Sequence, residues 1–417
     1  MDSVVPDFAS PTILVLVGTY LPGYKAGGPI RSIANLVAAL GGDIHFKVVT
    51  LDHDLGEKLS FPGIVTNRWV RVGKADVMYL QPGLRGFLRL WALLRAVDQN
   101  TVLYVNSFFA RRFSMLPVTM RWLKLCRPRC LVIAPRGEFS VEALRLKRLR
   151  KHLYIRIARW LGLYLGTIWH ASSDFEAEDI RRVQLTQNIN VAGVVHDLEL
   201  SRVAPSSVVV TASDVAEGGS LVSVARSPKR TGQLRAVFVS RISRMKNLSG
   251  ALRMLAGVSG DVSFDMYGPA EDSEYWEECR SVMAALPDNL RVRYCGQIAH
   301  EKVAQVLAEH DLFLFPTLGE NYGHVICEAL SSGCPVLISD QTPWRNLEAE
   351  GVGWDIPLGE PERFRSVLQQ CVDADDQWFA ELSRRAMDYA AKRASDPGTI
   401  AANRKLFQKA LAWPNPH

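Results

Sequence analysis

The chain has 417 residues, 48% of them hydrophobic and 22% charged, so it is long enough for two ordinary domains and is not intrinsically disordered. Its apolar runs are far shorter than the ~20 residues that cross a bilayer, and the acidic N-terminus, interrupted by Pro6, lacks the pattern of a secretory signal. The seven cysteines are scattered without CxxC spacing, which argues against a disulfide framework or a zinc site. These features predict a protein of the reducing cytoplasm.

The net charge of +6 hides an uneven distribution of basic residues along the chain. Residues 85–160 contain 17 Lys and Arg residues but three Asp and Glu residues. A nucleic acid, an anionic membrane surface or a phosphorylated substrate would each attract such a segment.

Short apolar, β-rich runs alternate with helical patterns in both halves of the chain. The expected strands are residues 12–18, 46–51, 101–106, 130–134, 234–240, 262–268, 290–296, 312–316 and 335–339. This alternation predicts two doubly wound α/β domains with parallel sheets, residues 1–199 and 234–394. Residues 200–233, rich in Ser, Ala, Gly and Pro, are interpreted as a linker with an insertion. Ligands of such sheets bind at the carboxyl ends of the strands.

The most informative stretch is FPTLGENYGHVICEALSSGCPVLISDQTPW, residues 315–344. After its first residues end a strand, Glu320 lies on a loop and a helix is expected to begin near Tyr322 and Gly323. The N-terminus of that helix offers N–H groups and a positive dipole end to a phosphate. Glu328 lies one and a half turns further on, about 7 Å along the axis. It is therefore placed to reach a group beyond the phosphates, such as a ribose diol.

Two further loops follow predicted strands. In VSRISRMKN (239–247), Arg241 and Lys246 are either ordinary basic loop residues or the cations that a diphosphate leaving group requires. Gly27 and Gly28, after the first strand, let backbone approach a phosphate, although a glycine pair is more often a simple turn. Neither GxGxxG nor a P-loop is present.

Together, the glycine pair, Arg241 with Lys246, and the Glu320-x7-Glu328 spacing resemble the family-4 retaining glycosyltransferases, which have the GT-B fold. The segments PRGEFS, GENYGHVICEAL and ISDQTPWRNLEAEGVGWDIPL are most similar to the subgroup that makes bacterial exopolysaccharide or O-antigen chains. The resemblance implies transfer of a sugar, with retention, from a nucleoside-diphosphate sugar to a glycan acceptor such as a polyprenyl-linked one. It also implies that neither a metal nor another cofactor is needed.

The resemblance further implies a role for each matching position. Glu320 would contact the donor sugar's hydroxyls and Glu328 the ribose, while the sugar and diphosphate would be lined by Asn321, Tyr322, Gly323, His324 and Val325. His324 is equally consistent with a packed side chain. Arg241 and Lys246 would neutralise the diphosphate, and Gly27 and Gly28 would close on it from the first domain. A C-terminal helix of about residues 395–411 would cross back onto the first domain.

One position departs from the family pattern. Many relatives have a histidine after the strand predicted at 130–134, whereas the nearest match here is Arg136. Arginine is a permanent cation and cannot act as a base. Arg136 would either hold a phosphate of donor or acceptor, or close a loop in a purely structural role.

Within the basic segment, residues 142–166 have the pattern of an amphipathic helix. Leu146, Leu149, Leu153 and Ile157 recur at helical spacing among arginines, with Tyr154 and Trp160 as candidate interfacial anchors. A core-facing helix with a solvated basic face would give a similar pattern. We expect residues 85–160 to contact an anionic membrane surface, and the protein to lie at the inner face of the plasma membrane.

Three other interpretations receive less support. Asp52-His53-Asp54 is a DxD sequence, which binds metal in the other large glycosyltransferase fold, but a single DxD is common. A nucleotide-sugar epimerase of the same fold would need acid/base groups at the sugar, and the first domain offers few. A nucleic-acid-binding protein would explain the basic segment, but no nucleic-acid-binding module is recognisable, so we expect no nucleic-acid partner.

Overall fold

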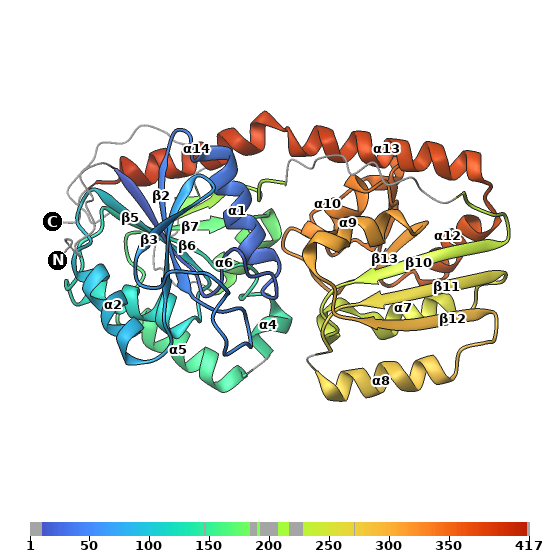
Figure 1. Cartoon of the computed structure of the whole chain (residues 1–417), viewed down its shortest axis with the longest axis horizontal. Helices are drawn as coiled ribbons and strands as arrows, with labels where there is room; N and C mark the ends of the chain where they lie inside the picture. The colour runs from blue at the N-terminus through green and yellow to red at the C-terminus, as the bar shows by residue number, and fades with distance from the viewer. Residues whose placement is uncertain are drawn as a thin grey trace. The chain divides into compact units, whose positions relative to one another are not determined.

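The computed structural model describes residues 11–145, 147–183, 190–191, 207–216, 228–270 and 272–414. The chain divides into two compact units (Figure 1), each an α/β structure with helices packed on its own sheet. The first unit comprises Met1–Val215 with Pro397–His417, and the second comprises Ala216–Asp396.

In the described part of the first unit, nine strands form one sheet in the order β3-β4-β2-β1-β5-β6-β7-β9-β8. Neighbours are parallel except β3 and β4. The strands are β1 (Thr12–Leu16), β2 (His45–Leu51), β3 (Trp69–Val72), β4 (Ala75–Leu80), β5 (Thr101–Asn106), β6 (Cys130–Ala134), β7 (Thr167–Ala171), β8 (Asn190–Val191) and β9 (Val208–Thr211). The helices are α1 (Gly28–Leu40), α2 (Leu84–Arg95), η1 (Arg111–Met115), α3 (Leu116–Trp122), α4 (Val141–Arg145), α5 (Arg148–Trp160), α6 (Asp174–Val183) and α14 (Pro397–Leu411).

The central strands β1, β5, β6 and β7 are buried on both faces of the sheet, which explains why they are mostly apolar in sequence. Along β1, Ile13 and Val15 belong to the core that includes α1 and α14, whereas Leu14 and Leu16 belong to the core that includes α2 and α5. Helix α14 completes the first of these cores, because the ring of Phe407 packs 5.6 Å from that of Phe46.

In the second unit the described strands form a six-stranded, all-parallel sheet in the order β12-β11-β10-β13-β14-β15. They are β10 (Gln233–Val239), β11 (Asp261–Tyr267), β12 (Leu290–Gly296), β13 (Leu312–Phe315), β14 (Val336–Ser339) and β15 (Gly353–Ile356). The helices are η2 (Arg244–Lys246), α7 (Leu248–Leu255), α8 (Ser273–Ala284), α9 (His300–Ala308), α10 (His324–Ser331), α11 (Leu347–Glu350), α12 (Pro361–Asp373) and α13 (Asp376–Ala394).

The predicted fold class of two parallel α/β domains is confirmed, and each predicted strand is present within two residues of its expected ends. The linker expected over 200–233 needs correction. Residues 208–211 form β9, which pairs with β7. Along the chain, the boundary between the two units falls between Val215 and Ala216. The apolar run Val208–Val210 has the character of a strand, but the Ser- and Gly-rich residues around it obscured that signal.

The single amphipathic helix expected over 142–166 is also wrong in detail. Lys147 adopts a left-handed conformation with φ of 54°, which separates α4 from α5. Leu146 lies outside the described residues. Tyr154 is not an exposed anchor, since its hydroxyl lies 2.7 Å from that of Tyr164 and its ring packs against Phe108. In the part of the chain that the structure describes, no helix has the length and apolar character needed to cross a bilayer.

We predict that Phe407→Ala destabilises the first unit by about 3–5 kcal/mol, because it empties a fully buried site between Phe46 and Tyr104. Lys405→Ala, on the exposed side of α14, should change the free energy of unfolding by less than about 0.5 kcal/mol. Urea denaturation of both variants checks this. Equal stability of the two variants would show that α14 does not complete this core.

Candidate functional site

The candidate site of the second unit is built on the loops that follow β10 and β13. These strands are parallel neighbours, with Ala236 opposite Leu312, so the chain leaves both at the same edge of the sheet. The loops are joined there by hydrogen bonds. The N–H of Leu318 donates to the carbonyl of Met245 over 2.8 Å, and the Asn247 side-chain amide donates to the carbonyl of Pro316 over 2.9 Å.

An ion pair lies where the two loops meet. Lys246 Nζ is 2.6 Å from Glu320 Oε2, and the side chains are only 12% and 18% exposed. The backbone fixes Glu320 as well, since its N–H donates to the carbonyl of Gln341 over 2.9 Å. A mostly buried carboxylate is tolerated only when it is paired and hydrogen-bonded, and Glu320 meets both conditions.

Several opposing effects act on the pKa of Glu320. Burial raises it, but the Lys246 ammonium and the hydrogen bond from the Asn321 N–H outweigh burial and hold the pKa below its ordinary value. The side chain is therefore a carboxylate at neutral pH. It can accept hydrogen bonds from hydroxyl groups, but it has no proton to give as a general acid.

Helix α10 begins immediately beyond this pair. Gly323, with φ of 81°, occupies the left-handed N-cap position. A Cβ atom there would lie 2.8 Å from Ile326 Cδ1, so this turn needs glycine. The buried Trp344 stabilises the turn by donating a hydrogen bond from its indole N–H to the carbonyl of Tyr322. The positive end of the α10 dipole is thereby held next to the Lys246–Glu320 pair.

The remaining predicted donor-site residues lie around this centre. His324 is the first residue of α10 and its ring is 4.7 Å from that of Tyr322; Val325 follows it in the first turn. Glu328 lies one turn further along, with Oε1 3.9 Å from Nδ1 of His300. Arg241 is exposed on the loop after β10. Glu320, Lys246 and the start of α10 thus come together, and Glu328 lies beside a histidine that the sequence patterns did not reveal.

Other supporting residues were also missed. Gln341 holds Glu320 through its backbone carbonyl. Since every residue has such a carbonyl, the sequence could not single out this position. Trp344 lies in a segment already singled out for its family resemblance, but its hydrogen bond to residue 322 depends on the tertiary fold.

In the first unit, the glycine pair begins α1. Gly27, with φ of 64°, is the N-cap and Gly28 is the first helical residue. The preceding loop is held by Asp54, whose carboxylate accepts hydrogen bonds from the N–H groups of Tyr24 at 2.8 Å and Lys25 at 3.1 Å. The DxD sequence therefore organises the glycine loop. Within the described residues, no cluster of three or more His, Cys, Asp or Glu side chains could hold a metal ion.

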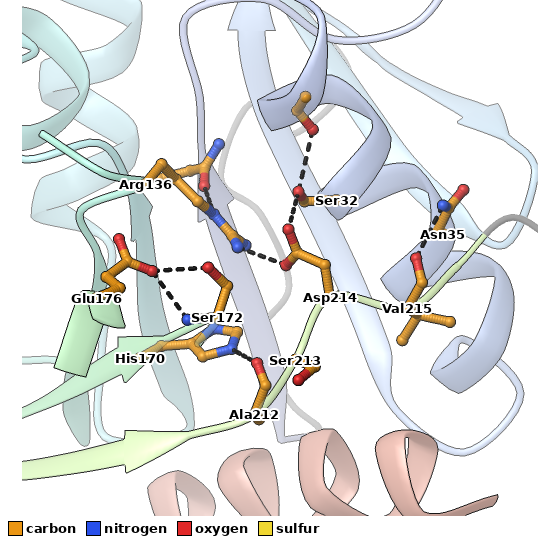
Figure 2. Close-up of polar contacts among 12 residues, drawn as sticks. Ser32, Asn35, Arg136, His170, Ser172, Glu176, Ala212, Ser213, Asp214 and Val215 are labelled. Atoms are coloured by element: carbon orange, nitrogen blue, oxygen red, sulfur yellow. Dashed lines mark hydrogen bonds and ion pairs between the residues drawn. The ribbon is translucent and has the colours of Figure 1, made fainter. Parts of the chain in front are cut away.

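Arg136 lies in a buried network of the first unit (Figure 2). Its guanidinium forms an ion pair with Asp214, and its Nε donates to Asn106 Oδ1 over 2.7 Å. Its Nη2 donates to the hydroxyl of Tyr104 over 2.8 Å. With each nitrogen engaged and the side chain only 7% exposed, this geometry favours the structural role over a phosphate ligand.

We predict that Lys246→Met lowers the stability of the second unit by about 1–3 kcal/mol at pH 7, because it leaves a buried carboxylate without its cation. Since the pKa of Glu320 in the folded protein lies below its unfolded value, the pair stabilises the protein above the unfolded pKa. That contribution disappears as the pH falls through the folded pKa. The difference between variant and wild type should therefore shrink as the pH falls below about 4.5, the ordinary pKa of a glutamate, toward the lower pKa of Glu320 in the folded protein.

Urea denaturation at several pH values measures this difference. Arg253→Met is the matched control, because Arg253 forms an exposed, 3.6 Å pair with Glu278 and should contribute less than about 1 kcal/mol. A Lys246→Met difference that does not vary with pH would contradict the pairing.

Part of the chain is similar to a known protein family. Residues 223–393 match the family model described as "Glycosyl transferases group 1". Phosphatidyl-myo-inositol mannosyltransferase of Mycobacterium leprae is 28% identical over 167 residues, covering 38% of this chain and 43% of the relative. The chain thus matches less than half the length of this curated relative.

Two solved structures match nearly the whole chain. Anabaena HepE in complex with UDP-glucose has a TM-score of 0.62 at 15% identity, covering 96% of this chain and 99% of that one. Sucrose-phosphate synthase of Thermosynechococcus elongatus has a TM-score of 0.64 at 15% identity, covering 97% and 99%. At these identities the likeness shows the fold. Residues 223–393 are therefore similar to the group 1 glycosyl transferases, and the chain has the GT-B fold.

Proposed function

We propose that this chain is a retaining glycosyltransferase that moves a sugar from a nucleoside-diphosphate sugar to a glycan acceptor. The observation that carries the proposal is the Lys246–Glu320 pair at the N-terminus of α10. It combines a cation, a helix dipole and an ionised carboxylate within one site. The first two suit a diphosphate, and the third suits the hydroxyl groups of a sugar.

Each group has a distinct task in this proposal. The Lys246 ammonium and the first N–H groups of α10 stabilise the negative charge that builds up on the departing diphosphate. Arg241 adds a second cation from the same loop. The Glu320 carboxylate accepts hydrogen bonds from the donor sugar and orients it, and Glu328 binds the ribose. Because protein cations and the dipole act on the diphosphate, the proposed reaction requires no metal ion or other cofactor.

The names of the similar proteins support a nucleoside-diphosphate sugar as donor and a lipid as part of the acceptor. HepE binds UDP-glucose, and the mycobacterial relative is named for transfer of mannose to a phosphatidylinositol. We infer a polyprenyl-linked or other membrane-borne glycan acceptor, and a role in bacterial cell-surface polysaccharide synthesis.

The surface of the first unit supports a membrane-borne acceptor. Among the described residues, 11 of the 18 exposed large hydrophobic side chains lie between positions 84 and 165, within and just beyond the basic segment. On α5, Leu149, Leu153, Ile157 and Trp160 follow one another at helical spacing and are 44–86% exposed. Helices α2 and α5 pack on the same core, so their apolar and basic side chains belong to one side of the sheet.

We infer that this surface, defined by α2, the end of α3 and α4–α5, rests on the anionic inner face of the plasma membrane. Helices α2, α4 and α5 of the first unit are labelled in Figure 1. The apolar side chains enter the interface, and the arginines and lysines around them are attracted to anionic headgroups, each by about 1 kcal/mol.

The donor assignment is tested with a panel of UDP-, GDP- and ADP-sugars in the presence of a chelator. We expect one donor to be bound and slowly hydrolysed, and Glu320→Ala to lower kcat by roughly 100-fold through loss of its contact with the sugar. Glu301→Ala, on the exposed surface of α9, should leave kcat unchanged. Absence of binding to every donor at millimolar concentration would refute the proposed function, and dependence of turnover on a metal would refute its metal-independent form.

The membrane surface is tested by co-sedimentation with vesicles of phosphatidylcholine containing about one third phosphatidylglycerol. We expect Leu149→Ser/Trp160→Ser to reduce the bound fraction at least fivefold, because two side chains lose their apolar insertion. Leu59→Ser/Phe175→Ser removes two exposed apolar side chains elsewhere and should bind as the wild type does. Equal loss in both double variants would contradict a localised surface.

A further inference from the structure

The four residues before the boundary at Val215, residues 212–215, are each held by a side chain from elsewhere in the first unit. Figure 2 shows these contacts for Ala212, Asp214 and Val215. His170 Nε2 and Asn403 Nδ2 each lie 2.8 Å from a backbone carbonyl, of Ala212 and Ser213 respectively. The carboxylate of Asp214 is bound by the side chains of Arg136 and Ser32. The carbonyl of Val215 accepts from Asn35 Nδ2 over 2.9 Å. We call residues 212–215 the anchor segment.

The hydrogen bonds from Arg136 through Tyr104 and His170 to Ala212 form a chain in which each group donates to the next. The Ala212 carbonyl can only accept, so His170 donates to it from Nε2 and its Nδ1 accepts from the Tyr104 hydroxyl, 2.8 Å away. That hydroxyl in turn accepts from Arg136. Burial, together with the Arg136 charge, lowers the pKa of His170 to about 4, so the imidazole is neutral, as this pattern requires.

The Arg136–Asp214 ion pair is the charged centre of the network. Both side chains are almost fully buried, at 7% and 6% exposed. Arg136 also adopts a left-handed backbone conformation with φ of 55°, which costs a non-glycine residue about 1 kcal/mol or more. The partners of its guanidinium, on β5 and in the anchor segment, offset that cost and keep Asp214 in one place.

Asp214 connects this centre to α1. The Ser32 hydroxyl lies 2.6 Å from Asp214 Oδ2 and 3.0 Å from the carbonyl of Gly28. A hydroxyl can donate one hydrogen bond, and the Ser32 hydroxyl donates it to the carboxylate, which is charged and nearer than the carbonyl. Asn35, three residues further along the same face of α1, binds Val215. The helix that begins with Gly27 and Gly28 is thus fastened at two points to the anchor segment.

We propose that Asp214 and Ser32 are positioning residues that set the place of the Gly27–Gly28 turn relative to the point where the chain leaves the first unit. The inference rests on the proposed function and on the contact with the donor diphosphate that the family resemblance implies for this turn. Asp54 fixes the loop before the turn and the anchor segment fixes the helix after it, so the turn is held in a single arrangement. Within it the Gly27 N–H donates to the carbonyl of Tyr24 over 2.9 Å, and it is the Gly28 end of the turn that we assign to the diphosphate.

Ser32→Ala tests the proposal more cleanly than a change at Asp214, since removing that carboxylate would leave the buried Arg136 guanidinium unpaired and threaten folding. Asn403→Ala is the matched control. It also releases one residue of the anchor segment, but Asn403 lies on α14 and does not contact α1 through this hydrogen bond.

Two measurements are made on the full-length variants. In hydrogen exchange, Ser32→Ala should speed exchange of the peptide covering residues 24–33 at least fivefold, and Asn403→Ala should not. In nucleotide binding, Ser32→Ala should weaken UDP or GDP about fivefold, as expected for loss of one hydrogen bond, and leave UMP or GMP unchanged. A role in overall stability alone would not separate diphosphate from monophosphate.

The outcomes distinguish the two proposals. If the wild type binds UDP or GDP but Ser32→Ala changes neither exchange nor the preference for diphosphate, the positioning role is wrong and the proposed function stands. If Ser32→Ala and Asn403→Ala have equal effects, the positioning role is likewise wrong. If the wild type binds no nucleotide, the proposed function fails. If Ser32→Ala also leaves exchange over residues 24–33 unchanged, the link between Ser32 and the turn is overturned as well.

Discussion

The parallel pairing of β10 with β13 is the constraint on which the candidate donor site depends. It brings Lys246 and Glu320, 74 positions apart in the sequence, into a 2.6 Å contact at the carboxyl edge of the sheet. Parallel strands end at the same edge, so the loops that follow them must meet there. The hydrogen bonds between these loops and the left-handed Gly323 turn then hold the start of α10 beside the pair.

Each unit contains a mostly buried ion pair between a basic side chain and a carboxylate, but the surroundings of the two pairs differ. Lys246 and Glu320 retain some exposure and adjoin a helix N-terminus, so a ligand can share their charges. The guanidinium of Arg136 is instead engaged by Asp214, Asn106 and Tyr104. We therefore interpret the first pair as part of a binding site and the second as an internal support. The number of protein partners, more than burial itself, separates the two roles.

Acidic residues that resemble a metal motif also serve the fold. Asp54 of the DxD sequence binds consecutive backbone N–H groups of the glycine loop, which fixes the approach to α1. The anchor segment holds the first half of the same helix through Ser32 and Asn35. A glycine-rich turn is intrinsically mobile, and polar contacts on both sides remove that freedom without placing a side chain at the turn itself.

The sequence by itself determined the two parallel α/β domains, because hydrophobic runs and turn signals are local properties of the chain. It also predicted the turn at Gly323 and the importance of Lys246 and Glu320, through the strand–loop–helix pattern and the family resemblance. It did not reveal that these two side chains form a pair or that residues 208–211 are a strand. Nor did it reveal that Arg136 forms a buried ion pair with Asp214. Those features arise from contacts between residues distant in sequence, and only the tertiary structure decides which polar groups meet and which remain available to a ligand.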